Sequence, residues 1–247
     1  MLKSIDEIQE LTLNIKQERY PEAEVVFLAG SYLRGEATKF SDLDLVVVFS
    51  SLAQARRESF IYDAMPVEAF IHDPETLNYF FYEVDRPTGI PSLMNMVAEG
   101  VVTPKPTAFS ESVKELAHSY LDLGPPPLTE SEISTARYFL SDLMDDIRAP
   151  RNYDELVATG SVLYQKLADF YLRVQGAWSA KGKSIPRRLK AIDSDFYRQF
   201  SLAFEKLFRK GESGWVIGLA EQVLEAQGGQ LFEGYQLTAP KDWRSSL

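Results

Sequence analysis

Two aspartates at the head of an apolar run constrain the fold of this chain more than any other feature of its sequence. Asp42 and Asp44 flank Leu43, and the run LDLVVVF continues to Phe49. Side chains two residues apart on a β-strand project to the same face. A strand over 43–49 therefore brings both carboxylates together on a segment apolar enough to be covered on both faces. Because adjacent carboxylates repel, a bound divalent cation is the simplest way to keep both ionised.

A third carboxylate, Glu68, lies within the apolar segment PVEAFI, residues 66–71. A carboxylate in an apolar strand needs a partner or a metal ion. If this strand is a neighbour of the strand over 43–49, Glu68 reaches the same point as the two aspartates. Oxygen ligands favour Mg²⁺ or Mn²⁺ over zinc, so the three side chains predict a two-metal site. The pair Asp-x-Asp by itself is also common in surface turns, and the third carboxylate is what favours the metal site.

Gly30 and Ser31 end the short apolar segment EVVFLA, residues 24–29. Glycine allows the backbone to approach a phosphate group closely, and the following N–H groups and the Ser31 hydroxyl can donate to its oxygens. The dipeptide alone is a weak signal. Its position between one strand and the Asp-x-Asp strand predicts a phosphate-binding turn beside the metal site.

A triphosphate also needs basic partners. Arg34 and Lys39 lie between the Gly-Ser pair and the aspartates, and a second basic cluster, KGKSIPRRLK, spans 181–190. Lys183 and Arg187 are the candidates from that cluster for phosphate binding, with Arg188 as an alternative. The competing interpretation of the cluster is a solvated loop and the start of a helix.

The stretch GSYLRGEATKFSDLDLVVVF resembles the signature of the DNA polymerase beta-type nucleotidyltransferase superfamily. That signature is Gly-Ser, roughly ten residues, Asp-x-Asp in a strand, and a third carboxylate one strand later. The resemblance covers residues 24–72. The remainder resembles the helical domain of small bacterial nucleotidyltransferases, including those that adenylylate aminoglycosides and lincosamides. The tail GGQLFEGYQLTAPKDWR, residues 228–244, resembles the end of a group of bacterial nucleotidyltransferase-like proteins.

The resemblance implies a role for each matching residue. Asp42 and Asp44 would bind two Mg²⁺ ions, and Glu68 would bind the ion that aligns the acceptor hydroxyl. Gly30 and Ser31 would hold the β- and γ-phosphates of a nucleoside triphosphate. The acceptor oxygen would attack the α-phosphorus in line, with pyrophosphate leaving. Two sources of a general base stay open: Glu68 itself, or a carboxylate of the helical domain, as in relatives with such a domain. On the first helix after the linker no motif selects one among Glu132, Asp142, Asp145 and Asp146.

The predicted fold is α+β: a small mixed sheet with flanking helices, then an all-helical bundle. The segment GPPP, residues 124–127, cannot continue a helix and separates a catalytic domain at 1–124 from a helical domain at 128–247. Capping boxes at Ser4–Glu7 and Thr129–Glu132 predict two helix starts. The expected strands are 24–29, 43–49 and 66–71. The expected helices are 5–18, 52–63, 73–84, 92–102, 110–121, 132–147, 153–175, 193–208 and 214–226.

Composition limits the partners. The formal net charge of −10 argues against binding to long nucleic acid and is compatible with a cationic acceptor, although it also serves solubility alone. The absence of cysteine excludes disulfides and thiol chemistry. The N-terminus does not resemble a signal peptide, so a cytoplasmic protein without a membrane partner is expected. His72 and His118 lack metal-ligand spacing, and a structural role is expected for His72.

Three functions follow from these patterns. The first is a Mg²⁺-dependent nucleotidyltransferase that transfers a nucleoside monophosphate, AMP from ATP, to a hydroxyl of an aminoglycoside-like small molecule. The second keeps this chemistry and takes a protein hydroxyl as acceptor, in the manner of toxin–antitoxin nucleotidyltransferases. The third is a regulatory module that binds a nucleotide without catalysis. Neither the nucleobase, the acceptor nor the oligomeric state is fixed by the patterns.

Overall fold

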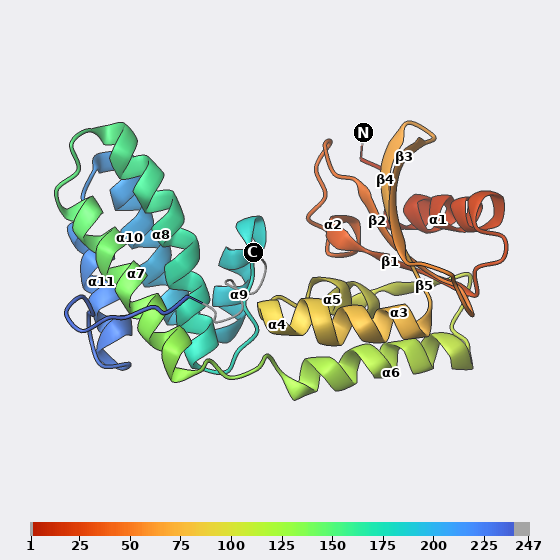
Figure 1. The fold of residues 1–247 in the computed structure, drawn as a ribbon. Helices are drawn as coiled ribbons and strands as arrows, with labels where there is room; N and C mark the ends of the chain where they lie inside the picture. The colour runs from red at the N-terminus through yellow and green to blue at the C-terminus, as the bar shows by residue number, and fades with distance from the viewer. Residues whose placement is uncertain (1, 240–247) are drawn as a thin grey trace, which may run out of the picture. The chain divides into compact units, whose positions relative to one another are not determined.

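The computed structural model describes residues 2–239, and its chain divides into two compact units, Met1–Pro125 and Pro126–Leu247 (Figure 1). The first unit contains a five-stranded mixed sheet with helices, and the described part of the second contains helices and loops. This architecture confirms the predicted α+β class. The end of the predicted irregular tail, residues 240–247, lies outside the described residues.

The sheet of the first unit has the strand order β3-β4-β2-β1-β5. Its strands are β1 (Val25–Ala29), β2 (Leu43–Val48), β3 (Arg56–Tyr62), β4 (Met65–His72) and β5 (Val101–Thr103). Neighbouring strands are antiparallel except β2 and β4, which run parallel. Every residue of β1 is buried, and Asp44 is the one residue of β2 that is not. The centre of the sheet is therefore apolar on both faces, with a carboxylate as its exception.

Helix α1 (Ile5–Arg19) covers one face of the sheet (Figure 1). Its apolar stripe of Ile8, Leu11 and Ile15 packs against alternate residues of the two parallel strands. These strand residues are Leu43, Leu45, Val47, Val67, Ala69 and Ile71. The predicted capping box begins the helix: Ser4 Oγ accepts from the Glu7 amide at 3.3 Å, and the Glu7 carboxylate accepts from the Ser4 amide at 2.6 Å. Periodicity in helix and strands thus builds one half of the core.

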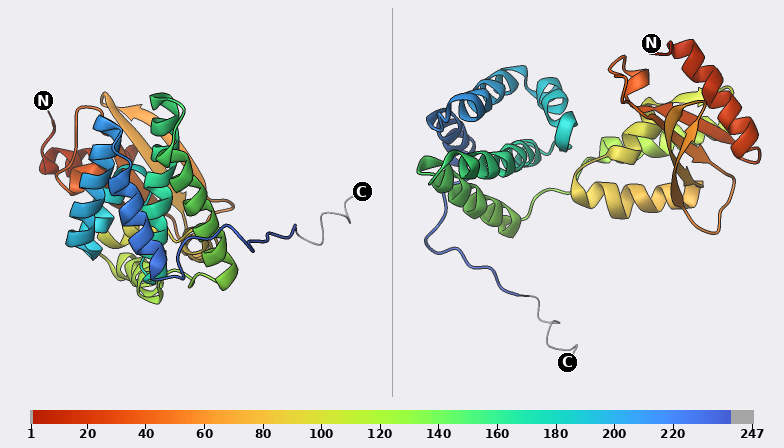
Figure 2. Two further views of the ribbon diagram at one scale, coloured as in Figure 1. Left: turned by 90° about the vertical axis from the view of Figure 1, so that its left-hand side faces the viewer. Right: turned by 90° about the horizontal axis from the view of Figure 1, so that it is seen from above.

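Helices from the segment 74–123 cover the other face (Figure 2). They are α3 (Pro74–Tyr79), the π-helical η1 (Phe80–Asp85), α4 (Arg86–Thr88), α5 (Ser92–Glu99) and α6 (Ala108–Leu123). Phe27 of β1 and Phe81 of η1 are fully buried in this layer. The buried Asp85 carboxylate of η1 accepts from the amides of Leu93 and Met94 at 2.8 and 3.1 Å, so that it satisfies two N–H groups in the first turn of α5.

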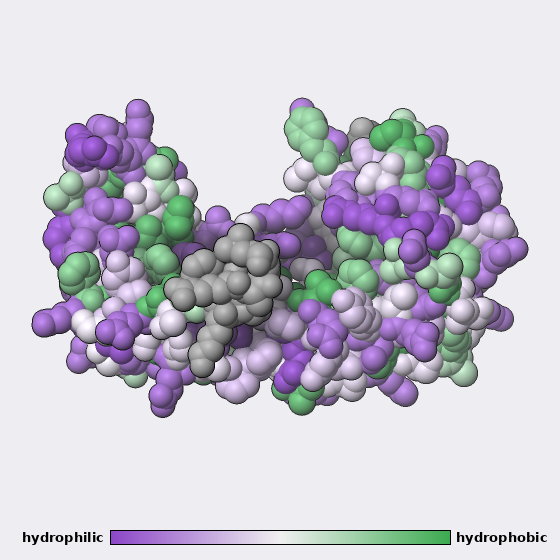
Figure 3. All heavy atoms as spheres, viewed as in Figure 1, coloured by the Kyte–Doolittle hydropathy of each residue, from purple (hydrophilic) through white to green (hydrophobic). Residues whose placement is uncertain are grey.

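The predicted helix over 52–63 is wrong, because Arg56–Tyr62 forms the edge strand β3. The partly buried residues Glu58, Phe60 and Tyr62 alternate, which is the period of a strand rather than a helix. Asp63 and Ala64 have φ of 47° and 59° and close a tight hairpin to β4. Figure 3 shows hydrophilic and apolar side chains mixed on the surface of this first unit.

The predicted helix over 92–102 ends early, at Glu99. Gly100 follows in an extended conformation, and the β-branched residues of Val101–Thr103 pair with β1 as the second edge strand, β5. A side chain at position 100 would be too close to the sheet, since its Cβ would lie 2.8 Å from Phe27 Cβ. Glycine therefore ends the helix and lets the chain enter the sheet.

The second unit is built from helices whose starts and ends are close to those expected, and it adds two elements that were not expected, the 3₁₀ turn η2 (Gly182–Ser184) and α9 (Ile185–Ile192). The helices that were expected are α7 (Glu130–Arg148), α8 (Tyr153–Val174), α10 (Ser194–Lys210) and α11 (Gly214–Glu225). Thr129 and Glu132 form the predicted capping box at the start of α7. The core includes Leu163, Phe200 and Phe204. Within residues 2–239, no helix combines the length and apolar character that a bilayer crossing requires.

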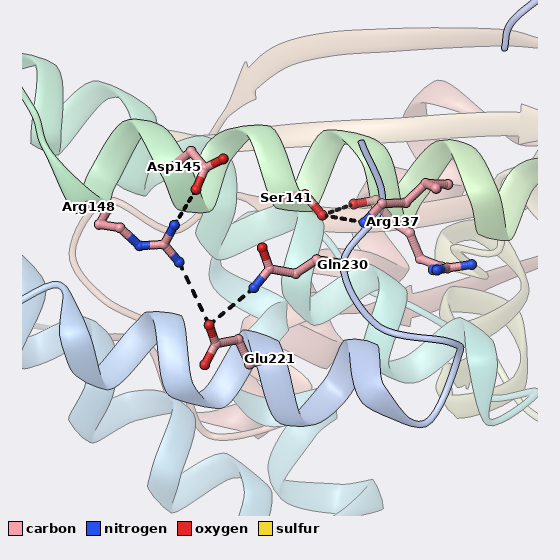
Figure 4. A network of polar contacts seen from close by, with 7 residues as sticks. Arg137, Ser141, Asp145, Arg148, Glu221 and Gln230 are labelled. Atoms are coloured by element: carbon pink, nitrogen blue, oxygen red, sulfur yellow. Dashed lines mark hydrogen bonds and ion pairs between the residues drawn. The ribbon is translucent and has the colours of Figure 1, made fainter. Parts of the chain in front are cut away.

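The segment after α11 is held against α7 by polar contacts (Figure 4). Arg137 donates to the carbonyls of Gly228 and Gly229 at 2.5 and 2.8 Å. Ser141 Oγ accepts from the Leu231 amide at 3.0 Å and donates to the Arg137 carbonyl at 2.8 Å. The ring of Tyr235 stacks on Tyr138 of α7, with 4.1 Å between ring centroids. The described part of the irregular tail is thus an ordered part of the second unit.

His72 generates a prediction about acid stability. It is 3% exposed at the end of β4, edge-on to Phe80, and burial lowers the pKa of its imidazole to about 4. Between pH 6.5 and pH 4 this imidazole is protonated in the unfolded chain and stays neutral in the folded chain. The free energy of unfolding therefore falls as the pH falls from 6.5 toward 4. We expect this imidazole to remove about 2 kcal/mol from the free energy of unfolding between pH 7.5 and pH 5.

The measurement is urea denaturation of the wild type and of His72→Phe at both pH values. The variant should lose less stability than the wild type over this interval, because it lacks the group that titrates. Equal losses in the two proteins would contradict a buried neutral imidazole.

Candidate functional site

Three carboxylates meet at one end of the parallel strand pair. The register places Asp44 of β2 opposite Glu68 of β4, and Asp42 precedes β2 by one residue. Each side chain offers one oxygen that lies within 4.8 Å of the other two, and all three residues are half-buried. The structure therefore brings together the three acidic residues that the spacing predicted would meet.

Along β2 and β4 the acidic residues lie directly next to apolar core residues. Asp44 and Val46 share a face of β2, and Val46 is completely buried. On β4 the half-buried Glu68 shares that face with Phe70, while the adjacent Val67 and Ala69 face the core beneath α1. The carboxylates thus lie on the face opposite α1, next to apolar core, where their charges are less screened than on an open surface.

Gly30 is required by the position of Asp44. It follows the last residue of β1, which pairs with Asp44, and it begins the single turn α2 (Gly30–Leu33). Its φ of 78° lies in the left-handed region, and a Cβ at this position would lie 1.9 Å from Asp44 Oδ2. No side chain fits between the turn and the carboxylate. Gly30 therefore lies directly beside the acidic group, and Ser31, the next residue, is 8% exposed.

The loop between Ser31 and Asp42 is a series of tight turns. The Glu36 amide donates to the Ser31 carbonyl at 2.9 Å, and the Ser41 amide donates to the Thr38 carbonyl at 3.0 Å. Ser41 Oγ accepts in return from the Thr38 amide at 2.9 Å. These bonds shape the spacer of the motif, so that the chain returns to Asp42 one residue before β2.

The two basic residues of this loop differ in their surroundings. Arg34 lies between two carboxylates, 3.2 Å from Glu36 and 3.8 Å from Glu99. Lys39 lies over the ring of Phe40, 4.8 Å from its centroid, and Phe40 is 83% exposed. Of the two, Lys39 is the more available to a phosphate group, because Arg34 already has acidic partners.

An arginine that the sequence analysis missed binds the third carboxylate. Arg57 of β3 donates from Nη2 to Glu68 Oε1, and its guanidinium lies 5.0 Å from the ring centroid of Phe70. A helix over 52–63 had been expected, and a helix would not place Arg57 beside β4. The residues Phe60, Ile61 and Tyr62, which favour strands, were the only sequence signal for β3, and the contact of Arg57 with Glu68 follows from the register of that strand.

The remaining candidates lie in the second unit. Lys183 is in η2 and Arg187 is in α9, and both are exposed. Arg188 is half-buried and donates from Nε to the Trp178 carbonyl at 2.8 Å, so the alternative in this cluster has a structural bond. The cluster as a whole is a 3₁₀ turn followed by a short helix, a conformation that both interpretations of the cluster allow.

The four candidate bases on α7 also differ. Glu132 accepts from the Thr129 amide and hydroxyl at 2.8 Å each, and these bonds lower the pKa of its carboxyl group. Asp145 is paired with Arg148. Asp142 and Asp146 are exposed. A base must be free to take a proton, which favours Asp142 and Asp146 over the other two.

The acidic group fits a hard divalent cation by its donor chemistry. Its ligands are oxygens only, they converge within 4.8 Å, and their mutual repulsion favours a positive occupant. The Arg57 guanidinium beside Glu68 is one positive group already paired with this cluster of carboxylates. The residues present are therefore suited to Mg²⁺ or Mn²⁺.

Comparison with known proteins gives a family for this segment. Residues 10–78 match the family model described as "Nucleotidyltransferase domain", and this range contains the Gly-Ser pair and all three carboxylates. The match confirms the predicted resemblance at the level of the domain. A similar solved structure is the nucleotidyltransferase-like protein from Exiguobacterium sibiricum 255-15, at 15% identity and a TM-score of 0.46, with 89% of this chain and 75% of that chain covered. No curated protein matches the chain.

Gly30→Ala tests the close approach of the turn to Asp44. The new Cβ would collide with Asp44 Oδ2, and the carboxylate must move. We expect Mn²⁺ affinity, measured by calorimetry or electron paramagnetic resonance, to fall at least about tenfold, because a displaced ligand breaks the convergence of the site.

Gly35→Ala is the matched control. Gly35 has a φ of 68°, and a Cβ there would meet nothing within 4 Å. Both variants therefore carry backbone strain of about 1–2 kcal/mol, and only one carries the collision. Equal loss of Mn²⁺ affinity in the two variants would show that strain, rather than contact with Asp44, is responsible.

Proposed function

We propose that this protein is a Mg²⁺-dependent nucleotidyltransferase that transfers a nucleoside monophosphate, AMP from ATP, to a hydroxyl of a small cationic acceptor. The observation that carries the proposal is the convergence of Asp42, Asp44 and Glu68 within 4.8 Å, beside the Gly30–Ser31 turn and inside a segment that matches a nucleotidyltransferase domain. The domain and the acidic group support the reaction class. The donor nucleotide and the acceptor are the proposed parts.

The chain's own groups divide the work by position. Asp42 and Asp44 project from neighbouring backbone positions and would hold the cations, and Glu68 would complete the ligand set from the adjacent strand. Bound Mg²⁺ would supply neutralisation of phosphate charge and activation of the attacking oxygen. The Ser31 hydroxyl and the amides that follow Gly30 would donate to the terminal phosphates. Little covalent chemistry falls to the protein, so rate comes from positioning and electrostatics.

A proton must leave the acceptor hydroxyl as the new bond to phosphorus forms. Glu68 would accept it from within the first unit, or an aspartate of α7 would accept it from the second. On that helix Asp142 and Asp146 are the candidates, since Glu132 caps the helix and Asp145 pairs with Arg148. The pyrophosphate that leaves would remain paired with basic residues, for which Lys39, Lys183 and Arg187 are proposed.

The charge distribution supports a cationic acceptor. Residues 1–125 contain 20 acidic and 10 basic residues, so the whole formal charge of −10 falls in the first unit and the second is neutral. A concentrated negative field raises the local concentration of cations, both metal ions and amines. It also disfavours a polyanionic acceptor such as a nucleic acid strand. An aminoglycoside-like polyamine alcohol combines the required hydroxyl with the complementary charge.

Pyrophosphate release tests the reaction. With Mg²⁺, each of the four nucleoside triphosphates, and a panel of aminoglycosides and lincosamides, the wild type should release pyrophosphate with one donor and one acceptor class. Asp42→Asn and Asp44→Asn should each lower the rate by at least about a hundredfold, because the cation loses a ligand. Asp63→Asn serves as control, since Asp63 is exposed, pairs with Lys3 and is not among the three converging carboxylates. Retained activity in both site variants would remove this site from consideration.

Nucleotide affinity tests the basic residues of the second unit. If Lys183 and Arg187 contact phosphate, Lys183→Ala and Arg187→Ala should each weaken ATP binding by about threefold to tenfold in the presence of Mg²⁺. Lys210→Ala, an exposed lysine at the end of α10, is the control for loss of one positive charge. Affinities that match this control in both variants would favour a solvated cluster.

A further inference from the structure

Arg57 reaches the acidic group because of the register of the edge hairpin. In the pairing of β3 with β4, Ser59 lies opposite Glu68 and Arg57 lies opposite Phe70. Arg57 is therefore diagonal to Glu68 on the same face of the sheet, and the small side chain of Ser59 leaves the path between them open. The guanidinium lies over the Phe70 ring and donates to Glu68 Oε1.

This contact places two demands on one carboxylate. Glu68 is the only member of the acidic group contributed by β4, and its oxygen lies within 4.8 Å of oxygens of Asp42 and Asp44. A guanidinium on Glu68 satisfies its charge and repels a divalent cation a few ångströms away. Because the guanidinium and a divalent cation repel each other across one carboxylate, they compete for Glu68.

We propose that Arg57 is a positioning residue that holds Glu68 while the acidic group carries no cation and releases it when the site is loaded. The inference rests on the proposed function, since it takes the acidic group to be a metal site. It predicts an order of filling: a cation binds first to Asp42 and Asp44, and Glu68 joins the ligand set last. Arg57 thereby weakens cation binding in the absence of nucleotide.

The ion pair between Arg57 and Glu68 can break with little loss of stability. The side chain of Arg57 is 60% exposed and that of Glu68 is 21% exposed, and ion pairs so close to water contribute little stability. Once released, the guanidinium keeps its charge at the rim of the site, where two oxygens of a phosphate group can accept from it in a bidentate pair. A nucleotide that arrives with its metal ion therefore supplies both the cation for Glu68 and a new acceptor for Arg57.

The neighbouring arginine provides a matched control. Arg56 is next to Arg57 on the same strand, and its side chain takes the opposite face. There it donates from Nε to Glu58 at 2.8 Å, and Glu58 also accepts from the Tyr20 hydroxyl at 2.8 Å. Removing Arg56 changes the net charge by the same amount as removing Arg57, without touching Glu68.

The test is a Mn²⁺ titration of the full chain without nucleotide, in which binding is measured by calorimetry or electron paramagnetic resonance. We expect Arg57→Gln to bind the ion of weaker affinity about threefold to tenfold more tightly than the wild type, because the competing charge is gone. Arg56→Gln should stay within about twofold of the wild type, since its charge is on the other face. Arg57→Lys, which keeps the charge, should remain close to the wild type. A gain of affinity is informative because a merely damaged fold would bind more weakly.

A second arm adds ATP with Mn²⁺. Arg57→Gln should lose its advantage and bind the nucleotide about threefold or more weaker than Arg56→Gln does, because the phosphate has lost a partner. Mn²⁺ affinity that is unchanged or weakened in Arg57→Gln would overturn the proposal, and so would an equal gain in the two glutamine variants.

The doubly substituted Asp42→Asn/Asp44→Asn protein separates this inference from the function on which it rests. If the wild type binds Mn²⁺, the double variant does not, and Arg57→Gln equals Arg56→Gln, the metal site stands and the role of Arg57 falls. If no variant binds Mn²⁺ more tightly than the double variant, both the metal site and the role of Arg57 fall.

Discussion

The parallel pairing of β2 with β4 is the interaction on which the rest of this structure depends. Its register puts Asp44 opposite Glu68, and Asp42 follows from the chain direction. The same register turns Leu43, Val67 and their alternates toward α1, so the core and the acidic group are fixed together. A slip of one residue would bury Glu68 under the helix and expose the apolar set, which makes this pairing strongly specified.

Placing three carboxylates together requires compensation from their neighbours. Gly30 has no side chain, which leaves space for the Asp44 carboxylate. Arg57 gives Glu68 a positive partner from the edge strand. Arg57 lies on β3 and Gly30 directly follows β1, and these two strands flank the parallel pair. The residues that accommodate the clustered carboxylates therefore come from the neighbouring strands. The acidic group is therefore a property of four strands, although only two of them contribute its ligands.

Much of this could be predicted from the sequence, because the decisive signals are local. The spacing of Asp42 and Asp44 predicts a shared face, Glu68 stands out within an apolar strand, and two capping boxes define helix starts correctly. The edge strands could not be predicted in the same way. The connection between two parallel strands is usually helical, and here a strand and a hairpin provide it. Arg57 was missed with β3, because its proximity to Glu68 is a matter of register between strands.

The hydrogen bonds of Arg137 and Ser141 to the segment after α11 change where local unfolding of the second unit can begin. Chain ends are ordinarily the places where a domain frays. Here Arg137 is bonded to the Gly229 carbonyl, 92 residues away along the chain, so the last described segment is fastened to the first helix of its own unit. Detachment of this segment exposes Tyr138 and breaks hydrogen bonds made by side chains of α7 at the same time. Helix α7 and residues 228–235 are thus thermodynamically linked, and loss of one weakens the other.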